Sequence, residues 1–301
     1  MSNKRIQENP LHLLVSFAVA TALLLANAGL GAGQKAERPG SHTRGKSGMS
    51  PEAIALVEEA IGVVCTEAKL DPRSSMAIDV MQARPSLPVQ TPEARDGAAR
   101  AQRLLPLAKN LVISSLNRLA VEYRLKGRQP FSLRIQQGIA RVRAVRTVRP
   151  DMESRDNASV FLSKPHTITF GTLFLAGLRS DEGMISVLAH ELMHIADGDR
   201  DGLRMLVLSV GSKASSLTGM DIRGQRSEEL TCDLIGAMAV RAYVAGTPGY
   251  ESISRRLSRS IEHNCVDVDE GDEDHLSPRA TIRALLSLNS ALVRELVNDQ
   301  Q

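Results

Sequence analysis

The segment spanning residues 186–196 is apolar except for Ser186, two histidines and a glutamate, and it restricts the possible folds of this chain more than any other stretch. His190 and His194 are four residues apart, so on a helix both imidazoles project from one face, where they can share a metal ion. Glu191 follows the first histidine directly and is placed to act as a general base on a water at that metal. The pattern H-E-x-x-H therefore predicts a helix with a zinc site for hydrolysis. The alternative is a core helix with incidental histidines on its polar edge.

A third metal ligand is expected on another apolar helix, because catalytic zinc sites use three protein ligands and leave the fourth position to water. Glu229 opens a second helical run that extends to Val240. Asp233 lies one turn further along the same face and can accept a hydrogen bond from the other ring nitrogen of a metal-bound histidine. Taken alone, these two acids are more typical of a solvated helix edge. Together with the histidine pair they predict a site in which His190, His194 and Glu229 are ligands and Asp233 supports a ligand.

The motifs follow one another as in the gluzincin metallopeptidases that include HtpX, the CAAX prenyl endopeptidase and the Oma-type mitochondrial proteases, and the chain resembles this family over residues 157–285. The matching motifs are Asn157-Ala158, Gly171-Thr-Leu173, Asp181-Glu182, the H-E-x-x-H segment, Glu229 with Asp233, Gly249-Tyr250 and His275-Leu-Ser-Pro278. The chain departs at Leu276, where the family has proline, and at Thr281, where arginine is usual. The separation of 229 − 194 = 35 residues between the two metal segments is also short for the family.

The resemblance implies a zinc-dependent endopeptidase that hydrolyses misfolded or envelope polypeptides and holds one Zn2+ per chain. The implied fold is α+β and zincin-like: mostly helical, with a small sheet beside the H-E-x-x-H helix. In the family an edge strand binds substrate as an added strand, which here assigns Asn157, Ala158, Ser159 and Val160 to substrate binding through main-chain groups. The family also places a histidine near the metal. His275 is the candidate, as a catalytic residue that stabilises the oxyanion or as a group that blocks the fourth metal position, and a surface histidine is the alternative.

Composition favours an ordinary globular enzyme and argues against a nucleic-acid partner. Hydrophobic residues make up 43% of the chain and charged residues 24%, which suffices for a normal core. The net charge is only +3, and aromatic residues make up 3% with no Trp, so neither a basic footprint nor a stacking surface is indicated. The rival function from another class is a zinc-stabilised chaperone or assembly factor of the cell envelope, which would bind polypeptides without cutting them.

The N-terminus has the pattern of a secretory signal. Lys4 and Arg5 precede an apolar run from residue 11 to residue 26, and Ala26 and Ala28 supply the small side chains that a signal peptidase reads. The run is shorter than the roughly 20 residues that a spanning helix needs. We therefore expect export to the periplasm, with an uncleaved membrane anchor as the alternative. Either arrangement allows association with membrane or envelope proteins.

Four regions are expected from composition and helix-start signals: a signal peptide at 1–28, a flexible linker at 29–49, a helical scaffold at 50–130 and the metallopeptidase core at 131–301. Helices are predicted to start at Pro51 and Pro92, the second bent or interrupted at Pro106. Residues 140–149 alternate apolar and basic side chains, which predicts a strand with one solvated face.

The three cysteines allow one disulfide in an oxidising compartment, in three pairings. Cys232 lies within the Glu229 helix and is interpreted as a small buried side chain, with a metal-binding role as the alternative, so Cys65 with Cys265 is the first pair to test. Residues 197–202 imitate half of a calcium loop, but Leu208 stands where calcium loops need a glutamate. A polar turn is expected there.

Overall fold

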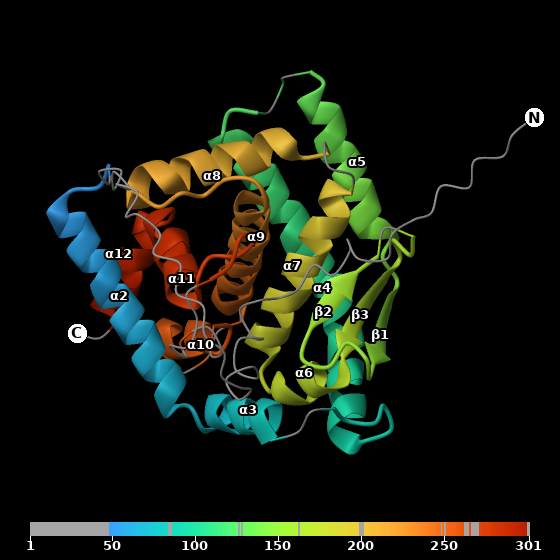
Figure 1. The fold of residues 1–301 in the computed structure, drawn as a ribbon. Helices are drawn as coiled ribbons and strands as arrows, with labels where there is room; N and C mark the ends of the chain where they lie inside the picture. The colour runs from blue at the N-terminus through green and yellow to red at the C-terminus, as the bar shows by residue number, and fades with distance from the viewer. Residues whose placement is uncertain are drawn as a thin grey trace, which may run out of the picture.

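The computed structural model describes residues 48–83, 86–125, 127, 129–161, 163–198, 202–247, 249, 251–261, 265 and 271–299. These parts of the chain are mostly helical and contain a three-stranded mixed sheet, an α+β arrangement (Figure 1). The helices are α2 (Pro51–Leu70), α3 (Pro72–Ala83), α4 (Pro92–Glu122), α5 (Phe131–Ala144), α6 (Thr172–Gly177), α7 (Asp181–Asp197), α8 (Arg204–Thr218), α9 (Gln225–Gly246), α10 (Ile253–Ser258), α11 (Pro278–Ser287) and α12 (Ser290–Asn298). The strands are β1 (Thr147–Asp151), β2 (Ala158–Val160) and β3 (Thr167–Gly171).

The helix starts predicted at prolines are confirmed. Ser50 caps α2 by accepting a hydrogen bond from the backbone N–H of Ala53, and Pro51 occupies the first turn, where its missing N–H costs nothing. Of the two alternatives expected at Pro106, a bend or an interruption, the interruption is wrong, because α4 runs through that residue to Glu122. Buried side chains recur along α4 on both sides of the proline, so packing against the core holds the helix together there.

The strand predicted at residues 140–149 is only partly present, because α5 extends to Ala144 and β1 begins at Thr147. The buried residues of α5 include Ile135, Ile139 and Val142, which repeat with helical spacing. The alternation of basic and apolar side chains therefore overlaps a longer helical pattern that starts upstream, and the helical pattern determines the structure up to residue 144.

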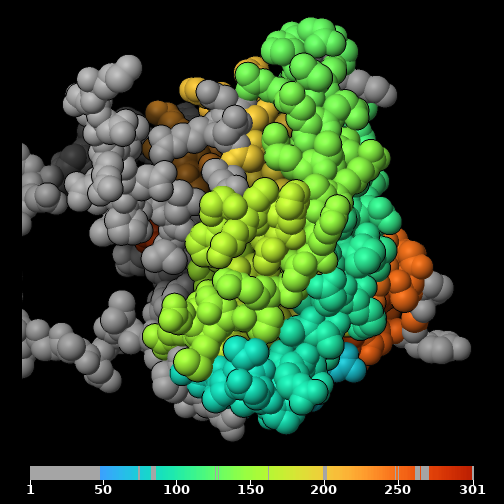
Figure 2. All heavy atoms as spheres, turned by 90° about the vertical axis from the view of Figure 1, so that its right-hand side faces the viewer, coloured from blue at the N-terminus to red at the C-terminus, as the bar shows by residue number. Residues whose placement is uncertain are grey.

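The sheet has the strand order β1-β3-β2, with β1 parallel and β2 antiparallel to the central β3. Its β1 edge is closed by the side chain of Gln102 on α4. The Gln102 amide oxygen accepts from Val148 N at 2.9 Å, and its NH2 donates to Arg146 O at 3.1 Å. Figure 2 shows atoms of α4 and α5 lying directly against the strands on this side. The opposite edge is β2, and no further strand pairs with it in the described residues.

The helix α7 is almost entirely buried and packs against α4, α5 and α9. Ser180 caps its start, as the sequence predicts, by accepting from Gly183 N at 3.0 Å. Arg141 of α5 caps its end: the guanidinium donates to the carbonyls of Ile195, Ala196 and Asp197. A cation at this position also suits the negative end of the helix dipole.

The polar turn expected at residues 197–202 falls partly on residues 199–201, which lie outside the described part of the chain. The Asp197 carboxylate accepts a hydrogen bond from Leu203 N. The Arg141 guanidinium lies against Gly198, where an added Cβ would come within 2.8 Å of it. Protein groups, namely a backbone N–H and a guanidinium, therefore contact the described residues at the end of α7.

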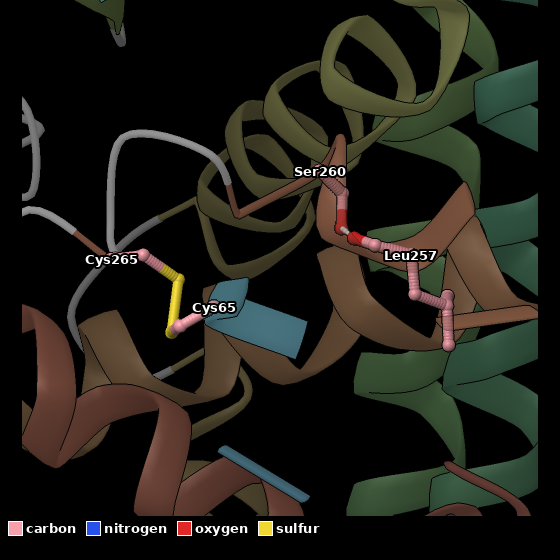
Figure 3. The surroundings of a disulfide bond; sticks show 4 residues. All are labelled: Cys65, Leu257, Ser260 and Cys265. Carbon is pink, nitrogen blue, oxygen red and sulfur yellow. Dashed lines mark hydrogen bonds between the residues drawn. A yellow bond between two sulfur atoms is a disulfide. The ribbon is translucent and has the colours of Figure 1, made fainter. Parts of the chain in front are cut away.

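The first helix of the described residues, α2, is fixed to the C-terminal helices by covalent and ionic links. Cys65 and Cys265 form the disulfide that the sequence favours, drawn in Figure 3 beside Leu257 and Ser260, and Cys232 is free and buried. Ion pairs join the same parts of the chain: Arg255–Glu67, Arg259–Asp71, Arg279–Glu58 and Arg283–Glu58. The beginning and the end of the described chain thus form one packed body.

None of the helices in the described residues has the length and hydrophobicity needed to cross a membrane. The predicted signal segment at 1–28 lies outside the described residues, as does the linker up to residue 47. The boundary expected at 130/131 lies at the start of α5, where Pro130 precedes Phe131.

Candidate metal centre

The candidate centre lies where α7 packs against α9, the most extensive helix contact in the fold. His190, Glu191 and His194 come from α7, and Glu229 comes from the first turns of α9. All four are buried, with at most 6% of each residue exposed. Polar groups this deeply buried are costly unless they pair with each other or bind an ion, so their concentration in one place indicates a site.

Three donor atoms converge in this interface. The Nε2 atoms of His190 and His194 are 3.1 Å apart, and Oε2 of Glu229 lies 3.3 Å from the first and 3.6 Å from the second. Ligands held at 2.0–2.1 Å in tetrahedral geometry around zinc are separated by about 3.3 Å from each other. The triangle of donors in this structure therefore has the size of three zinc ligands.

The other ring nitrogens of the histidines face different partners. Nδ1 of His190 lies 2.8 Å from Oδ1 of Asp233. Nδ1 of His194 lies 3.5 Å from Oε1 of Glu228 and 3.6 Å from Sγ of Cys232. Asp233 is thus in the position predicted for a residue that orients a metal-bound histidine.

Cys232 offers a second donor set. His190, His194 and Cys232 form a buried group whose candidate ligand atoms lie within 4.8 Å of one another, so this group can hold a metal ion. The two histidines are common to both donor sets, and the choice lies between the Glu229 carboxylate and the Cys232 thiol. Burial raises the pKa of that thiol above its ordinary value, despite the opposing effect of His194. The thiolate, which is the form that binds metal, is therefore the disfavoured one without an ion.

The buried charges shift the pKa values in opposite directions. Burial alone would lower the pKa of His190, but hydrogen bonds to Asp233 and Glu229 outweigh it and raise the pKa to about 9. Burial would raise the pKa of Glu229, but the charges of His194 and His190 and their hydrogen bonds hold it below its ordinary value. The ionised Glu229 carboxylate thus stabilises a positive charge placed beside it, whether on a histidine or on a bound cation. Burial also raises the pKa of Glu191, partly opposed by the charges of the two histidines.

His275 lies beside this group although it is far away in the sequence. It is 8% exposed, its Nδ1 lies 3.1 Å from Oδ1 of Asp272, and its backbone N–H donates to the same oxygen. Its Nε2 has no hydrogen-bond partner among the described residues and lies 3.9 Å from Oε2 of Glu229. Gly271, at φ 78°, begins the turn, and Arg226 of α9 donates to Asp272 O, so the loop is tied to the helix that carries Glu229.

The structure thus brings together His190, Glu191, His194, Glu229, Asp233 and His275, which the sequence singles out as site residues. Asn157 lies just before β2, and Ala158, Ser159 and Val160 form that edge strand, which contacts α7. The sequence reasoning missed Glu228 as a partner of His194, and it placed a metal-binding role of Cys232 behind that of a small buried side chain, although the thiol lies beside the same ring. A signal for both was present, because residues 228 and 232 are one turn apart and directly precede 229 and 233.

The chain matches no protein-family model, no curated protein and no solved structure.

Proposed function

We propose that this protein is a zinc-dependent endopeptidase of the gluzincin type. The observation that carries the proposal is the convergence of His190 Nε2, His194 Nε2 and Glu229 Oε2 at mutual distances of 3.1–3.6 Å, next to the buried carboxyl group of Glu191. Two neutral nitrogen ligands and one carboxylate are a donor set that hydrolytic zinc sites use.

The His190, His194 and Glu229 set is favoured over the set with Cys232 by the direction of the imidazoles. Both Nε2 atoms lie near each other and near the Glu229 carboxylate, whereas the Cys232 sulfur lies at Nδ1 of His194. Asp233 at Nδ1 of His190 favours the tautomer whose lone pair is on Nε2. Each histidine thus presents Nε2 to the centre and Nδ1 to a supporting group.

The proposed chemistry assigns a separate task to each side chain. A bound zinc ion would supply a Lewis acid that polarises the scissile carbonyl and makes a water acidic near neutral pH. Glu191 takes the proton of the attacking water and delivers it to the leaving amine. His275 has its Nδ1 at the Asp272 carboxylate, so its Nε2 donates a hydrogen bond to the oxyanion on the substrate only when both ring nitrogens carry a proton.

The substrate is proposed to be an extended polypeptide that adds to the sheet at β2. The β1 edge has its backbone groups engaged by Gln102, so that edge cannot accept a strand without displacing α4. The β2 edge, Ala158–Val160, borders the helix with the proposed metal ligands, and all three of its residues are buried, so a substrate strand would first have to gain access to this edge. Recognition through main-chain groups requires an unfolded segment but little sequence specificity. Misfolded or envelope polypeptides are therefore the proposed substrates.

The test is hydrolysis of casein by the purified protein together with its zinc content. The parent should bind one zinc ion per chain and cut casein. Glu191→Gln, which keeps the shape but cannot accept the proton, should lose at least 100-fold in rate while retaining zinc. Glu59→Gln, at an exposed position on α2, is the matched control and should behave as the parent does. Cleavage by Glu191→Gln at the parent rate, or no zinc in the parent, would overturn the proposal.

The same variants separate a protease from a chaperone of the cell envelope. A chaperone should suppress aggregation of an unfolded protein equally well with Glu191→Gln, and the parent should leave that protein intact. The variant His275→Ala tests whether the protein is a latent protease. If the imidazole blocks the fourth metal position instead of stabilising the oxyanion, this substitution should raise the rate of cleavage.

A further inference from the structure

Each histidine of the candidate centre needs a partner for the ring nitrogen that faces away from the metal, and the two histidines differ in how this need is met. His190 has Asp233 at 2.8 Å. His194 has two neighbours at Nδ1, the Glu228 carboxylate at 3.5 Å and the Cys232 sulfur at 3.6 Å. Only one of these can hold His194 in the tautomer that a metal at Nε2 requires.

The two neighbours have opposite effects on the ability of His194 to bind a metal. When Nε2 gives its lone pair to a metal, Nδ1 carries the proton and must donate it. A carboxylate is a strong acceptor for that proton. A protonated thiol is a weak acceptor, and if it donated its own proton to Nδ1 it would favour the tautomer with hydrogen on Nε2, which cannot bind metal. The buried Cys232 thiol therefore opposes metal binding when it acts as a donor, whereas Glu228 supports it.

We propose that Glu228 is the positioning residue of His194, as Asp233 is of His190. This inference rests on the proposed ligand set of His190, His194 and Glu229. At 3.5 Å the Glu228 carboxylate is a few tenths of an ångström beyond a normal N–H···O distance. Its side chain is 32% exposed, so it has room to close this gap.

The helix α9 thus supplies the metal-binding carboxylate and both supporting carboxylates. Glu228 and Glu229 are adjacent, so their side chains diverge by about 100° around the helix. Asp233 lies one turn after Glu229 and reaches the other histidine. One helix therefore orients both imidazoles of α7, and Cys232, 1% exposed, lies beside Nδ1 of His194.

The experiment measures zinc affinity by competition with a chromophoric chelator, at low and at high salt, for the full-length protein. Loss of an orienting partner typically weakens metal binding 10- to 100-fold. Glu228→Leu should show a loss of about this size, and Glu228→Gln a smaller one because its amide oxygen still accepts the Nδ1 proton. Cys232→Ala should bind zinc at least as tightly as the parent. Glu59→Gln, which removes the same charge from an exposed site on α2, should have no effect.

Salt and cobalt distinguish positioning from other roles of Glu228. A loss that comes only from removing a nearby negative charge should shrink at high salt, because the side chain is partly exposed; a loss of orientation should persist. In the cobalt-substituted protein, Glu228→Leu should change the visible ligand-field bands, which report the arrangement of the ligands. Circular dichroism of each variant establishes that it is folded.

Three results would overturn the inference: zinc affinity of Glu228→Leu within twofold of the parent, a loss that disappears at high salt, or unchanged cobalt bands. A sulfur-to-cobalt charge-transfer band that Cys232→Ala removes would assign the thiol as a ligand and overturn the ligand set as well. Failure of the proposed function would instead appear as unimpaired cleavage by Glu191→Gln, independently of the Glu228 variants.

Discussion

Removing the Cys65–Cys265 disulfide should cost much of the stability of this protein. The bond joins residues 200 apart in sequence, so it closes a very long loop in the unfolded chain. In the chain-entropy model, a loop of this length corresponds to about 18 cal/mol/K, or about 5 kcal/mol at 25 °C. Since whole domains are stable by only about 5–15 kcal/mol, the Cys65→Ala/Cys265→Ala double variant should be close to unfolding at 37 °C.

The assay is urea denaturation of the parent and the double variant, each with and without a thiol reductant, followed by circular dichroism. Reductant should lower the midpoint of the parent to about that of the double variant and should leave the double variant unchanged. Cys232 remains in both proteins, so its thiol is controlled for. A difference in unfolding free energy below about 1 kcal/mol would refute the entropic reasoning, and would mean that the disulfide restricts the unfolded chain much less than the loop length implies.

Two further predictions concern the end of α7. Arg141→Met should destabilise the fold by roughly 2–4 kcal/mol, because three carbonyls lose a charged donor. The matched control is Arg143→Met, at an exposed position on the same helix. Equal urea midpoints for the two variants would contradict this role of Arg141. Burial raises the pKa of Asp197 from 3.8 to about 6. The folded state therefore favours the protonated acid, and the stability that this contributes is complete below pH 4 and lost as pH rises through 6. In metal-free protein, Asp197→Asn should gain up to about 3 kcal/mol relative to the parent between pH 4 and pH 7.5; a constant difference across this range would be evidence against a shifted carboxyl.

The helix α7 is the part of the structure that the sequence predicts most directly, because its information is local. A cap at Ser180 and two histidines four residues apart fix the helix start and the common face of the imidazoles without reference to any other element. Asp233 was predictable for the same reason, as it lies one turn from Glu229. The disulfide followed from a similar local argument, since the helical setting of Cys232 left Cys65 and Cys265 as the remaining pair.

Contacts that depend on two distant elements could not be read in this way. Glu228 has the appearance of a solvated acid on a helix edge, and only the packing of α9 on α7 brings it to His194. The place of His275 depends on a loop that follows α10, and the resemblance to a family, not any periodicity, suggested it. The error at residues 140–144 has a different cause: two periodic patterns share the same residues, and tertiary packing of Val142 decides between them.

The distance between α7 and α9 is itself set by a residue that no motif contains. Gly236 of α9 faces Ser186 of α7, and an added Cβ would lie 3.0 Å from the Ser186 carbonyl oxygen. A glycine here lets the helix backbones approach more closely than a larger side chain would allow. Ser186 is one turn before His190 and Gly236 is two turns after Glu229, so this contact lies along the same interface as the donors. Because the donors span only 3.1–3.6 Å, a few tenths of an ångström between the helices change the fit of a metal ion. Helix packing outside the motif therefore determines whether the motif can work as a metal site.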